Sequence, residues 1–207
     1  MKAVIMTGRS SASILTRLVP ALEKLQADEI IVAGRSALKD ELDGWHERER
    51  GRFNGPLTFR FYNGNGHLQD LDAVIRLFRL EHLHDSVLLV SPGAGAPLDL
   101  SGLKKCLSLH AHLPLIGVRK PDHTPAFGAV SIGDRNRITR FSSTHERREN
   151  EWEPAGVYYF PERFLSDGIP AFLKARNVSD PAFESFLSWS VRNFKIYAHV
   201  FAAHPGL

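Results

Sequence analysis

The sequence contains one cysteine, Cys106, among 207 residues. A single cysteine cannot form an intramolecular disulfide, and it cannot supply the several thiolates of a cysteine-based zinc cluster. The sequence therefore excludes a disulfide-stapled scaffold. It is typical of a protein from a reducing compartment, and we predict a cytoplasmic location.

Long apolar runs are also missing. No stretch of 18 apolar residues is present, so no membrane-spanning helix is predicted. The apolar run at the N-terminus covers only residues 3–6, which is too short for the core of a signal peptide. We therefore expect neither a membrane partner nor a secretion signal.

The sequence also has little excess of positive over negative charge. The formal net charge is +3 and the sequence pI is about 9.1, whereas a nucleic-acid surface needs clustered positive charge. The densest charged cluster, "THERRENEWE" at 144–153, sets two arginines among four glutamates. Mixed signs of this kind predict a solvated loop, so no nucleic-acid partner is expected.

What the sequence does contain is an alternation of strand and helix patterns through its first half. Apolar, β-rich runs predict strands at 2–7, 28–34, 57–62, 86–90 and 113–118, and helical periodicity predicts helices at 14–25, 37–45, 68–80 and 100–110. Ser10, Ser11 and Ser13 are candidate N-caps for the first helix, which Pro20 is expected to kink or restart. Such alternation predicts an α/β fold with a doubly wound, mostly parallel sheet.

The pattern changes after residue 120. A hairpin is expected over 127–142 with its turn at 133–136, followed by a strand at 155–160, a turn and a short helix within 161–174, a helix at 180–192, and a last strand at 195–201. We expect the hairpin to extend a mixed sheet. No interdomain linker is apparent, so a single domain over 1–207 is predicted.

Six segments, taken in order, resemble the sugar-1-phosphate nucleotidyltransferases, also called sugar-nucleotide pyrophosphorylases. They are "MKAVIMTG" (1–8), "ILTRLVPALEKLQADEIIVAG" (14–34), "LLVSPGAGAPLDLSGL" (88–103), "FGAVSIGDRNRITRF" (127–141), "PAGVYYF" (154–160) and "KIYAHVF" (195–201). The resemblance implies a three-layer, nucleotidyltransferase-like sheet of the glycosyltransferase-A type, which is Rossmann-like in outline.

The first departure from the family lies after the first strand. There the family has a Gly-Gly-x-Gly-Thr-Arg loop and a Pro-Lys-Pro segment, whose backbone N–H groups and cations hold nucleotide phosphates. Here Gly8, Arg9, Ser10 and Ser11 lead almost directly into the helix. These residues are either a simple helix cap or a small anion-binding nest to which Arg9 adds charge.

The second departure is the loop after the strand at 86–90. The resemblance places a metal-binding aspartate where Gly93 stands, and glycine offers Mg²⁺ no carboxylate oxygen. Asp99 follows six residues later, where the N-cap of the next helix is the simpler interpretation. No catalytic residue and no metal ligand is therefore predicted; Mg²⁺ at Asp99 belongs only to the alternative below.

Three further features of the family are missing. Its Glu-Lys-Pro after the hairpin reads Ser-Ser-Thr at 142–144, the asparagine before Ala-Gly is Pro154, and the chain stops at "HPGL" before a second metal carboxylate. Gly64 and Gly66 fall near the family's nucleobase- and sugar-contacting segment. A plain loop that caps the following helix is the simpler interpretation of these two glycines.

The sequence as a whole predicts a degenerate, catalytically inactive relative of these enzymes. Such a protein would bind a protein partner, a second copy of itself, or a nucleotide or nucleotide sugar, with no cofactor. The alternative is an active transferase, in which Arg9 and Ser10 hold phosphate and Asp99 with a neighbouring carboxylate holds Mg²⁺. An exposed apolar patch would favour the protein-partner interpretation.

Overall fold

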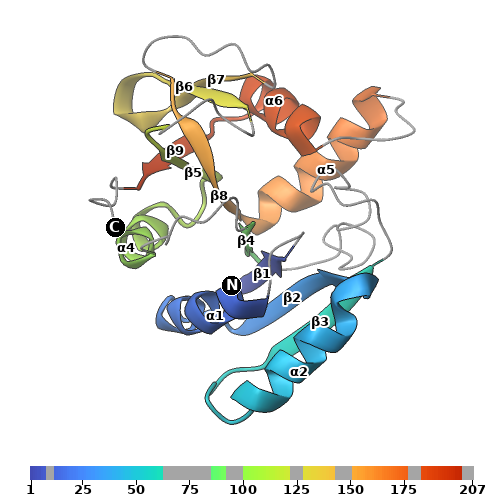
Figure 1. Cartoon of the computed structure of the whole chain (residues 1–207). Helices are drawn as coiled ribbons and strands as arrows, with labels where there is room; N and C mark the ends of the chain where they lie inside the picture. Colours follow the sequence, from blue (N-terminus) through green and yellow to red (C-terminus); the bar gives the residue numbers. More distant parts are fainter. Residues whose placement is uncertain are drawn as a thin grey trace.

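A computed structural model describes residues 1–7, 12–62, 85–91, 100–121, 128–142, 151–176 and 183–201. Seven strands form one sheet in the order β3-β2-β1-β4-β8-β5-β9 (Figure 1). Their bounds are β1 Lys2–Met6, β2 Glu29–Arg35, β3 Leu57–Tyr62, β4 Val87–Val90, β5 Leu115–Arg119, β8 Glu153–Phe160 and β9 Tyr197–Val200. The predicted α/β class with a mixed, mostly parallel sheet is confirmed.

Six of the seven strands run in the same direction, and β8 runs against them. β1 pairs in parallel with β2 and β4, β2 with β3, and β5 with β9, whereas β8 is antiparallel to both β4 and β5. The parallel strands therefore end at one edge of the sheet, which we call the carboxyl edge, and β8 begins there.

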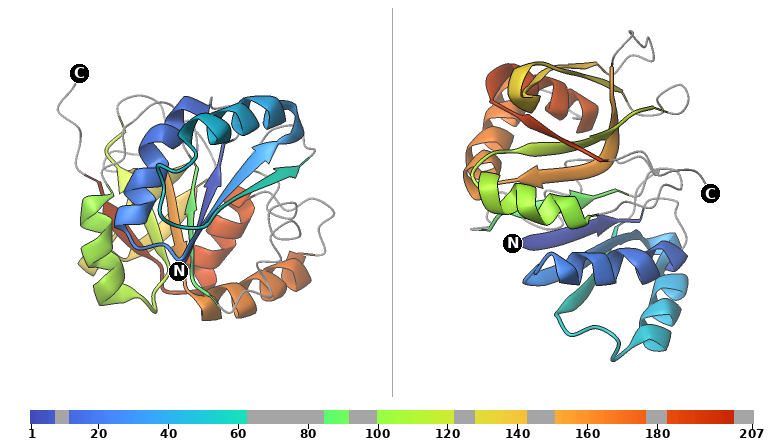
Figure 2. Two further views of the ribbon diagram at one scale, coloured as in Figure 1. Left: turned by 90° about the horizontal axis from the view of Figure 1, so that it is seen from below. Right: turned by 90° about the vertical axis from the view of Figure 1, so that its left-hand side faces the viewer.

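Helices cover both faces of this sheet and complete three layers (Figure 2). One apolar core joins the sheet to α1 (Leu15–Lys24), α2 (Lys39–Glu49) and α4 (Ser101–His110). A second core joins the opposite face to α5 (Glu162–Arg176), α6 (Phe183–Asn193) and a hairpin. The central strand β4 is apolar throughout because its side chains on both faces are buried.

Helix α1 differs from its predicted form at its start and in its middle. A 3₁₀ turn at Ala12–Ile14 precedes it, and its N-cap position is Ile14, which makes no side-chain capping bond; the expected serine cap at Ser13 is therefore wrong. Pro20 lies inside one continuous helix and does not restart it. Burial of Leu15, Leu18 and Leu22 under the sheet holds the helix together across the proline.

The hairpin forms where the sequence predicts it, with β6 at Ala129–Ile132 and β7 at Ile138–Ser142. Its turn contains Arg135 and Asn136 at positive φ. It does not extend the main sheet as expected, because β6 and β7 make a separate two-stranded sheet. Single bridges from Val130 to Trp152 and from Arg137 to Tyr197 attach it to the rest of the protein.

Other elements keep their predicted places with shifted ends. Helix α4 begins at Ser101 and its N-cap position is Leu100, whereas Asp99, the expected cap, lies outside the described residues. Helix α5 runs to Arg176 and is longer than expected. The helix predicted at 68–80 lies outside the described residues. Within the described residues, no helix is both long and apolar enough to cross a membrane.

Candidate functional site

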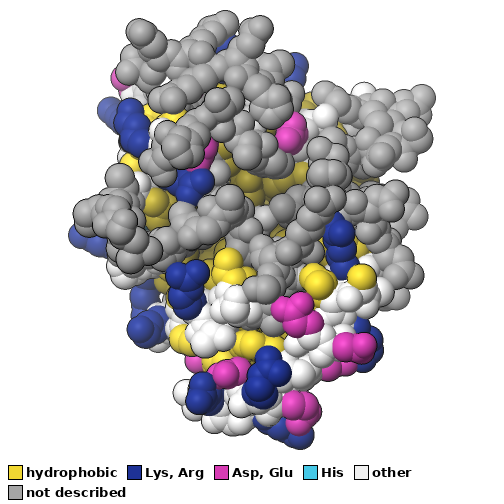
Figure 3. All heavy atoms as spheres, in the orientation of Figure 1, with side chains coloured by type: hydrophobic (Ala, Val, Ile, Leu, Met, Phe, Trp, Pro, Cys, Tyr) yellow, Lys and Arg dark blue, Asp and Glu magenta, His cyan; other side chains and the backbone are white. Residues whose placement is uncertain are grey.

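The carboxyl edge is where an α/β sheet with this topology places a ligand. After β1 the chain moves outward to β2 and β3, then returns to β4 on the other side of β1. Ligands of such sheets bind in the crevice beyond the two strands where the winding direction reverses, which here are β1 and β4. Figure 3 shows the molecule from the side of this edge, where Lys and Arg side chains are exposed beside Asp and Glu side chains.

Two buried residues continue β1 and β4 beyond their last paired positions. The backbone N–H of Thr7 donates to the Ala33 carbonyl at 3.0 Å, and its hydroxyl donates to the same oxygen at 3.2 Å. The N–H of Ser91 donates to the Gly156 carbonyl at 2.6 Å. Both residues are at most 5% exposed. They hold the start of each following segment at the carboxyl edge.

The residues that the sequence singled out follow these anchors or the end of β3. Gly8, Arg9, Ser10 and Ser11 come after Thr7, Gly93 and Asp99 come after Ser91, and Gly64 and Gly66 come after Tyr62. All eight lie outside the described residues. Their roles in ligand binding stay predictions, and what is established is that their segments leave the sheet at the carboxyl edge.

Sequence reasoning missed an ion pair at this edge. The guanidinium Nε of Arg119, the last residue of β5, donates to Oε1 of Glu153, the first residue of β8. The two residues face each other in the strand register, and their side chains are 26% and 11% exposed. The low local dielectric strengthens this pair compared with a surface pair. The prediction that this stretch is a solvated loop is wrong for Glu153.

Glu151 corrects the same prediction, since it is only 4% exposed. The Ser131 hydroxyl of β6 donates to its Oε1 at 3.1 Å. Paired backbone bonds between Val130 and Trp152, at 2.8 and 2.9 Å, hold this segment against the hairpin. The alternation of apolar and acidic residues in "EWEPAG" is typical of a strand segment, but it predicts that the acids face solvent, so the sequence held no signal for their burial.

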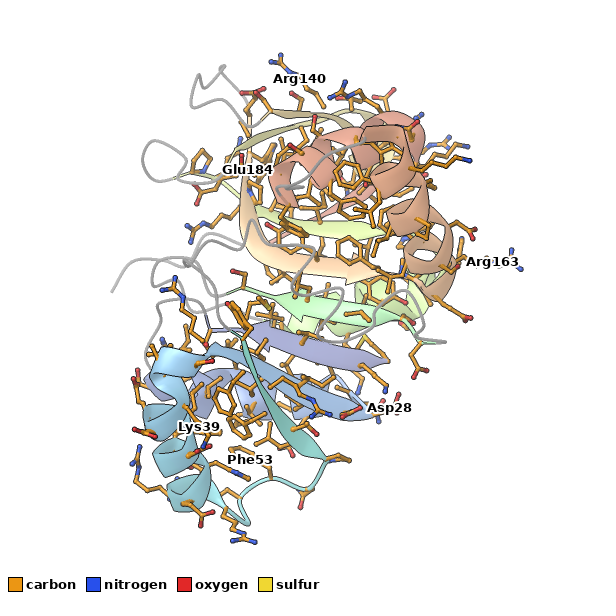
Figure 4. All side chains as sticks on the ribbon, turned by 90° about the vertical axis from the view of Figure 1, so that its right-hand side faces the viewer. Asp28, Lys39, Phe53, Arg140, Arg163 and Glu184 are labelled. Carbon is orange, nitrogen blue, oxygen red and sulfur yellow. The ribbon has the colours of Figure 1, made fainter. Side chains whose placement is uncertain are left out.

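Lys120 adds a cation to the same place. Its ammonium lies 4.2 Å from the centre of the Trp152 ring, a cation–π contact. In Figure 4 the strands end on the left, where Glu184 at the start of α6 is labelled, and Arg163 and Asp28 lie toward the opposite end. The described part of the carboxyl edge therefore combines cations, aromatic surface and carboxylates that already have partners.

These carboxylates do not fit a Mg²⁺ site. Mg²⁺ prefers carboxylate oxygens together with several waters, but Glu153 already faces the Arg119 guanidinium and Glu151 accepts from Ser131. Within the described residues, no group of three or more His, Cys, Asp or Glu side chains is arranged to hold a metal ion.

Arg35, at the end of β2, is the least satisfied cation among the described residues of this edge. The side chain is partly buried. Its Nε and Nη2 atoms are shielded from solvent and make no hydrogen bond to any residue that the structure describes. Buried donors are hydrogen-bonded in most proteins, so these two N–H groups require an explanation.

A surface groove of about 350 Å³ lies between α1 and α4, away from the strands. It is lined by Arg17, Pro20, Ala21, Lys24, Leu25, Leu100, Ser101 and Lys104. Exposed large apolar side chains among the described residues are Leu109, Leu173 and Val200. These belong to α4, α5 and β9 respectively, on different sides of the sheet, so they do not form the apolar patch that would favour a protein partner.

Comparison with known proteins identifies the fold. No protein-family model matches the sequence, and no curated protein sequence matches it. A crystal structure from Bacillus anthracis, of a protein assigned as a glucose-1-phosphate thymidylyltransferase and crystallised with sucrose, is similar with a TM-score of 0.71 and 12% identity. The match covers 98% of this chain and 87% of that one.

A second similar structure is HddC from Yersinia pseudotuberculosis, with a TM-score of 0.65 and 13% identity. That match covers 96% of this chain and 89% of HddC. Likeness at such low identity establishes a shared fold over nearly the whole chain and no more, because one fold hosts many activities.

Proposed function

We propose that this chain is a degenerate member of the sugar-1-phosphate nucleotidyltransferase family that binds a nucleotide or nucleotide sugar without transferring a nucleotidyl group. The ligand occupies the carboxyl edge beside β1 and β4. Binding there serves a regulatory or scaffold role, exerted on a protein partner or on a second copy of the chain.

The observation that carries this proposal is that Glu153 and Glu151, two described acids at the carboxyl edge, already have partners. Glu153 pairs with Arg119, and Glu151 accepts from Ser131. Lys120 and Arg35 bring positive charge to the same edge. The substitution of Gly93 for the family's aspartate agrees with this arrangement. Together these residues favour the binding of an anionic ligand over metal-assisted transfer.

The start of α4 supports the second candidate, an active Mg²⁺-dependent transferase. Leu100 is buried at the N-cap position, so Asp99 directly precedes the first turn of a helix that follows β4. In this alternative Asp99 and a neighbouring carboxylate would hold Mg²⁺, and Arg9 with Ser10 would hold phosphate. The metal would neutralise the charge that develops as pyrophosphate leaves.

A thermal-shift panel tests the proposal directly. Purified protein is heated with each nucleoside triphosphate and with nucleotide sugars, with and without Mg²⁺, and pyrophosphate release is measured with added sugar phosphates. A ligand that binds the native state raises the midpoint by mass action. We expect at least one nucleotide-bearing ligand to raise the midpoint without Mg²⁺ and without turnover.

Two other outcomes would replace the proposal. Pyrophosphate release that Asp99→Ala abolishes and Asp85→Ala leaves intact would establish the transferase. Asp85 is a matched control because it is an exposed aspartate at the opposite end of β4. No shift with any nucleotide would remove the ligand and leave a protein partner as the function.

A further inference from the structure

The starting observation is the position of Arg35 within β2. Arg35 pairs with Tyr62 of β3 at the carboxyl edge. Ala33, two residues earlier, belongs to the core on the α5 and α6 face, together with Met6 of β1. Successive side chains of a strand alternate between faces, so Arg35 leaves the sheet on that same face. It is the last residue of β2 before the chain turns toward α2.

The two unpartnered atoms of Arg35 are adjacent. Nε and Nη2 form one side of the planar guanidinium, and their N–H bonds point in nearly the same direction. This pair matches two oxygens of a single phosphate or carboxylate group, which accept both hydrogens side by side. One such group would satisfy both buried donors at once. The two unpartnered N–H groups thus have the geometry to donate two parallel hydrogen bonds to one anionic group.

We infer that Arg35 is a ligand-binding residue that receives the phosphate group of a small molecule through Nε and Nη2. The inference rests on the proposed function in placing the ligand at the carboxyl edge, and it adds the residue and the chemical group that it recognises. Unpaired buried donors are costly, and an anion removes that cost.

Two acids that the structure describes at this edge are engaged by residues other than Arg35. Glu153 is engaged by Arg119, and Glu151 accepts from Ser131. Among the described residues, no carboxylate is hydrogen-bonded to Arg35. Arg35 therefore differs from Arg119, whose Nε donates to an internal acid on the neighbouring strand.

The test compares Arg35→Met and Arg35→Lys with the unaltered protein. Met keeps the length of the side chain and removes every donor, whereas Lys keeps the charge and loses the side-by-side pair. Arg60→Met is the matched control, because Arg60 is an exposed arginine on the adjacent strand β3. Each protein is melted alone and titrated with inorganic phosphate, glucose 1-phosphate, a nucleotide sugar and glucuronate.

The expected result concerns both the melting temperature and the affinity for the ligand. Arg35→Met melts at the same temperature as the unaltered protein or higher, because two unsatisfied buried donors are gone. Its affinity for the phosphate ligand falls by about tenfold or more, the size expected for a charge-assisted pair of hydrogen bonds. The affinity of Arg35→Lys for the phosphate ligand falls by less. Arg60→Met keeps the melting temperature and the affinity of the unaltered protein.

Each remaining outcome decides a separate question. A lower melting temperature for both Arg35 variants would assign Arg35 a structural role and overturn the inference. Equal nucleotide-sugar binding by all variants would also overturn it and leave the proposed function standing. Arg35-dependent binding of phosphate or glucose 1-phosphate without nucleotide binding would support the inference while the proposed function fails. Binding of glucuronate alone would assign a carboxylate ligand and overturn the phosphate assignment.

Discussion

Glu153 shows how a single residue at the carboxyl edge can be structural although it lies where chemistry is expected. It is the first residue of β8, and its carboxylate accepts from Arg119 of the neighbouring strand. Removing one member of a partly buried pair leaves the other charge without compensation. The pair therefore joins β5 to β8 where the register between them is irregular.

Glu153→Gln is expected to lower the free energy of unfolding by about 1–3 kcal/mol, the range for hydrogen bonds to charged groups. The amide keeps the size of the side chain and removes its charge. Urea denaturation followed by circular dichroism measures the change. Glu47→Gln is the control, because Glu47 forms an exposed surface pair with Arg50 and such pairs contribute little. Equal losses for the two variants would refute a special role for Glu153.

His199 on β9 provides a pH-dependent prediction. Burial lowers the pKa of its imidazole below the usual range. The ring packs edge-on against Phe201, with ring centres 4.8 Å apart, and lies close to Gly102 of α4. The folded state therefore favours the neutral ring. Its contribution to stability is complete above the pKa of the unfolded chain, about 6.5, and is lost as the pH falls through and below that value.

We expect His199→Gln to flatten the fall in stability between neutral and mildly acidic pH. The free energy of unfolding is measured at several pH values for the unaltered protein and the variant. The difference between the two proteins should shrink or reverse toward low pH. A difference that is constant across the pH series would show that His199 does not titrate on unfolding.

These residues mark the limit of sequence reasoning about the site. The charge pattern of 144–153 does not reveal that Glu153 contacts Arg119, 34 positions away. An unpartnered guanidinium such as that of Arg35 is equally invisible, since an arginine after a strand reads as a surface residue. Pairing and burial at the edge depend on tertiary contacts that one sequence does not encode locally.

At the scale of elements, α1 combines a favourable apolar face with an unfavourable residue. Pro20 has no N–H, so the Thr16 carbonyl loses its partner one turn later. The helix persists because Leu15, Leu18, Val19 and Leu22 are buried against the sheet. Local propensity predicted an interruption here, and packing overrides it.

Pro20→Ala should raise the free energy of unfolding by about 1–3 kcal/mol, because it restores a helical hydrogen bond and removes a poor helix former. Thermal and urea denaturation measure the gain. Pro56→Ala serves as control: Pro56 precedes β3 outside any helix, where its carbonyl accepts from the Ile30 N–H. That variant should be neutral or slightly destabilised. A loss of stability in Pro20→Ala would mean that the proline ring contributes more through packing than it costs.

At the scale of the whole molecule, the sequence predicts most strands and the parallel first half but not the full order. Strand patterns at 57–62 and 113–118 fall close to β3 and β5. Nothing local reveals that β8 inserts between β4 and β5, or that the hairpin forms its own sheet. Strand order depends on contacts distant in sequence, and patterns of hydrophobicity specify faces rather than neighbours.

The two cores share every strand of the sheet, so we expect one cooperative unfolding transition. Trp45 reports on the α1, α2 and α4 side, and Trp189 of α6 reports on the other. Trp152→Phe combined with either Trp45→Phe or Trp189→Phe leaves a single reporter. In each variant the fluorescence and circular dichroism midpoints in urea should coincide. Separate midpoints would show that the layers unfold independently.

The antiparallel insertion of β8 has a consequence for how the chain is made. β4 sits in the middle of the sheet, yet its pairing with β8 joins Val90 to Val157. Synthesis proceeds at about 5–20 residues per second. The edge of β4 that pairs with β8 therefore stays unpaired for several seconds, until β8 has left the ribosome. Until then the nascent first half exposes an open strand edge of four apolar residues, the kind of surface that invites association with other chains. Translation speed between these two strands, or a chaperone that shields β4, would then govern how much of the protein reaches its native state.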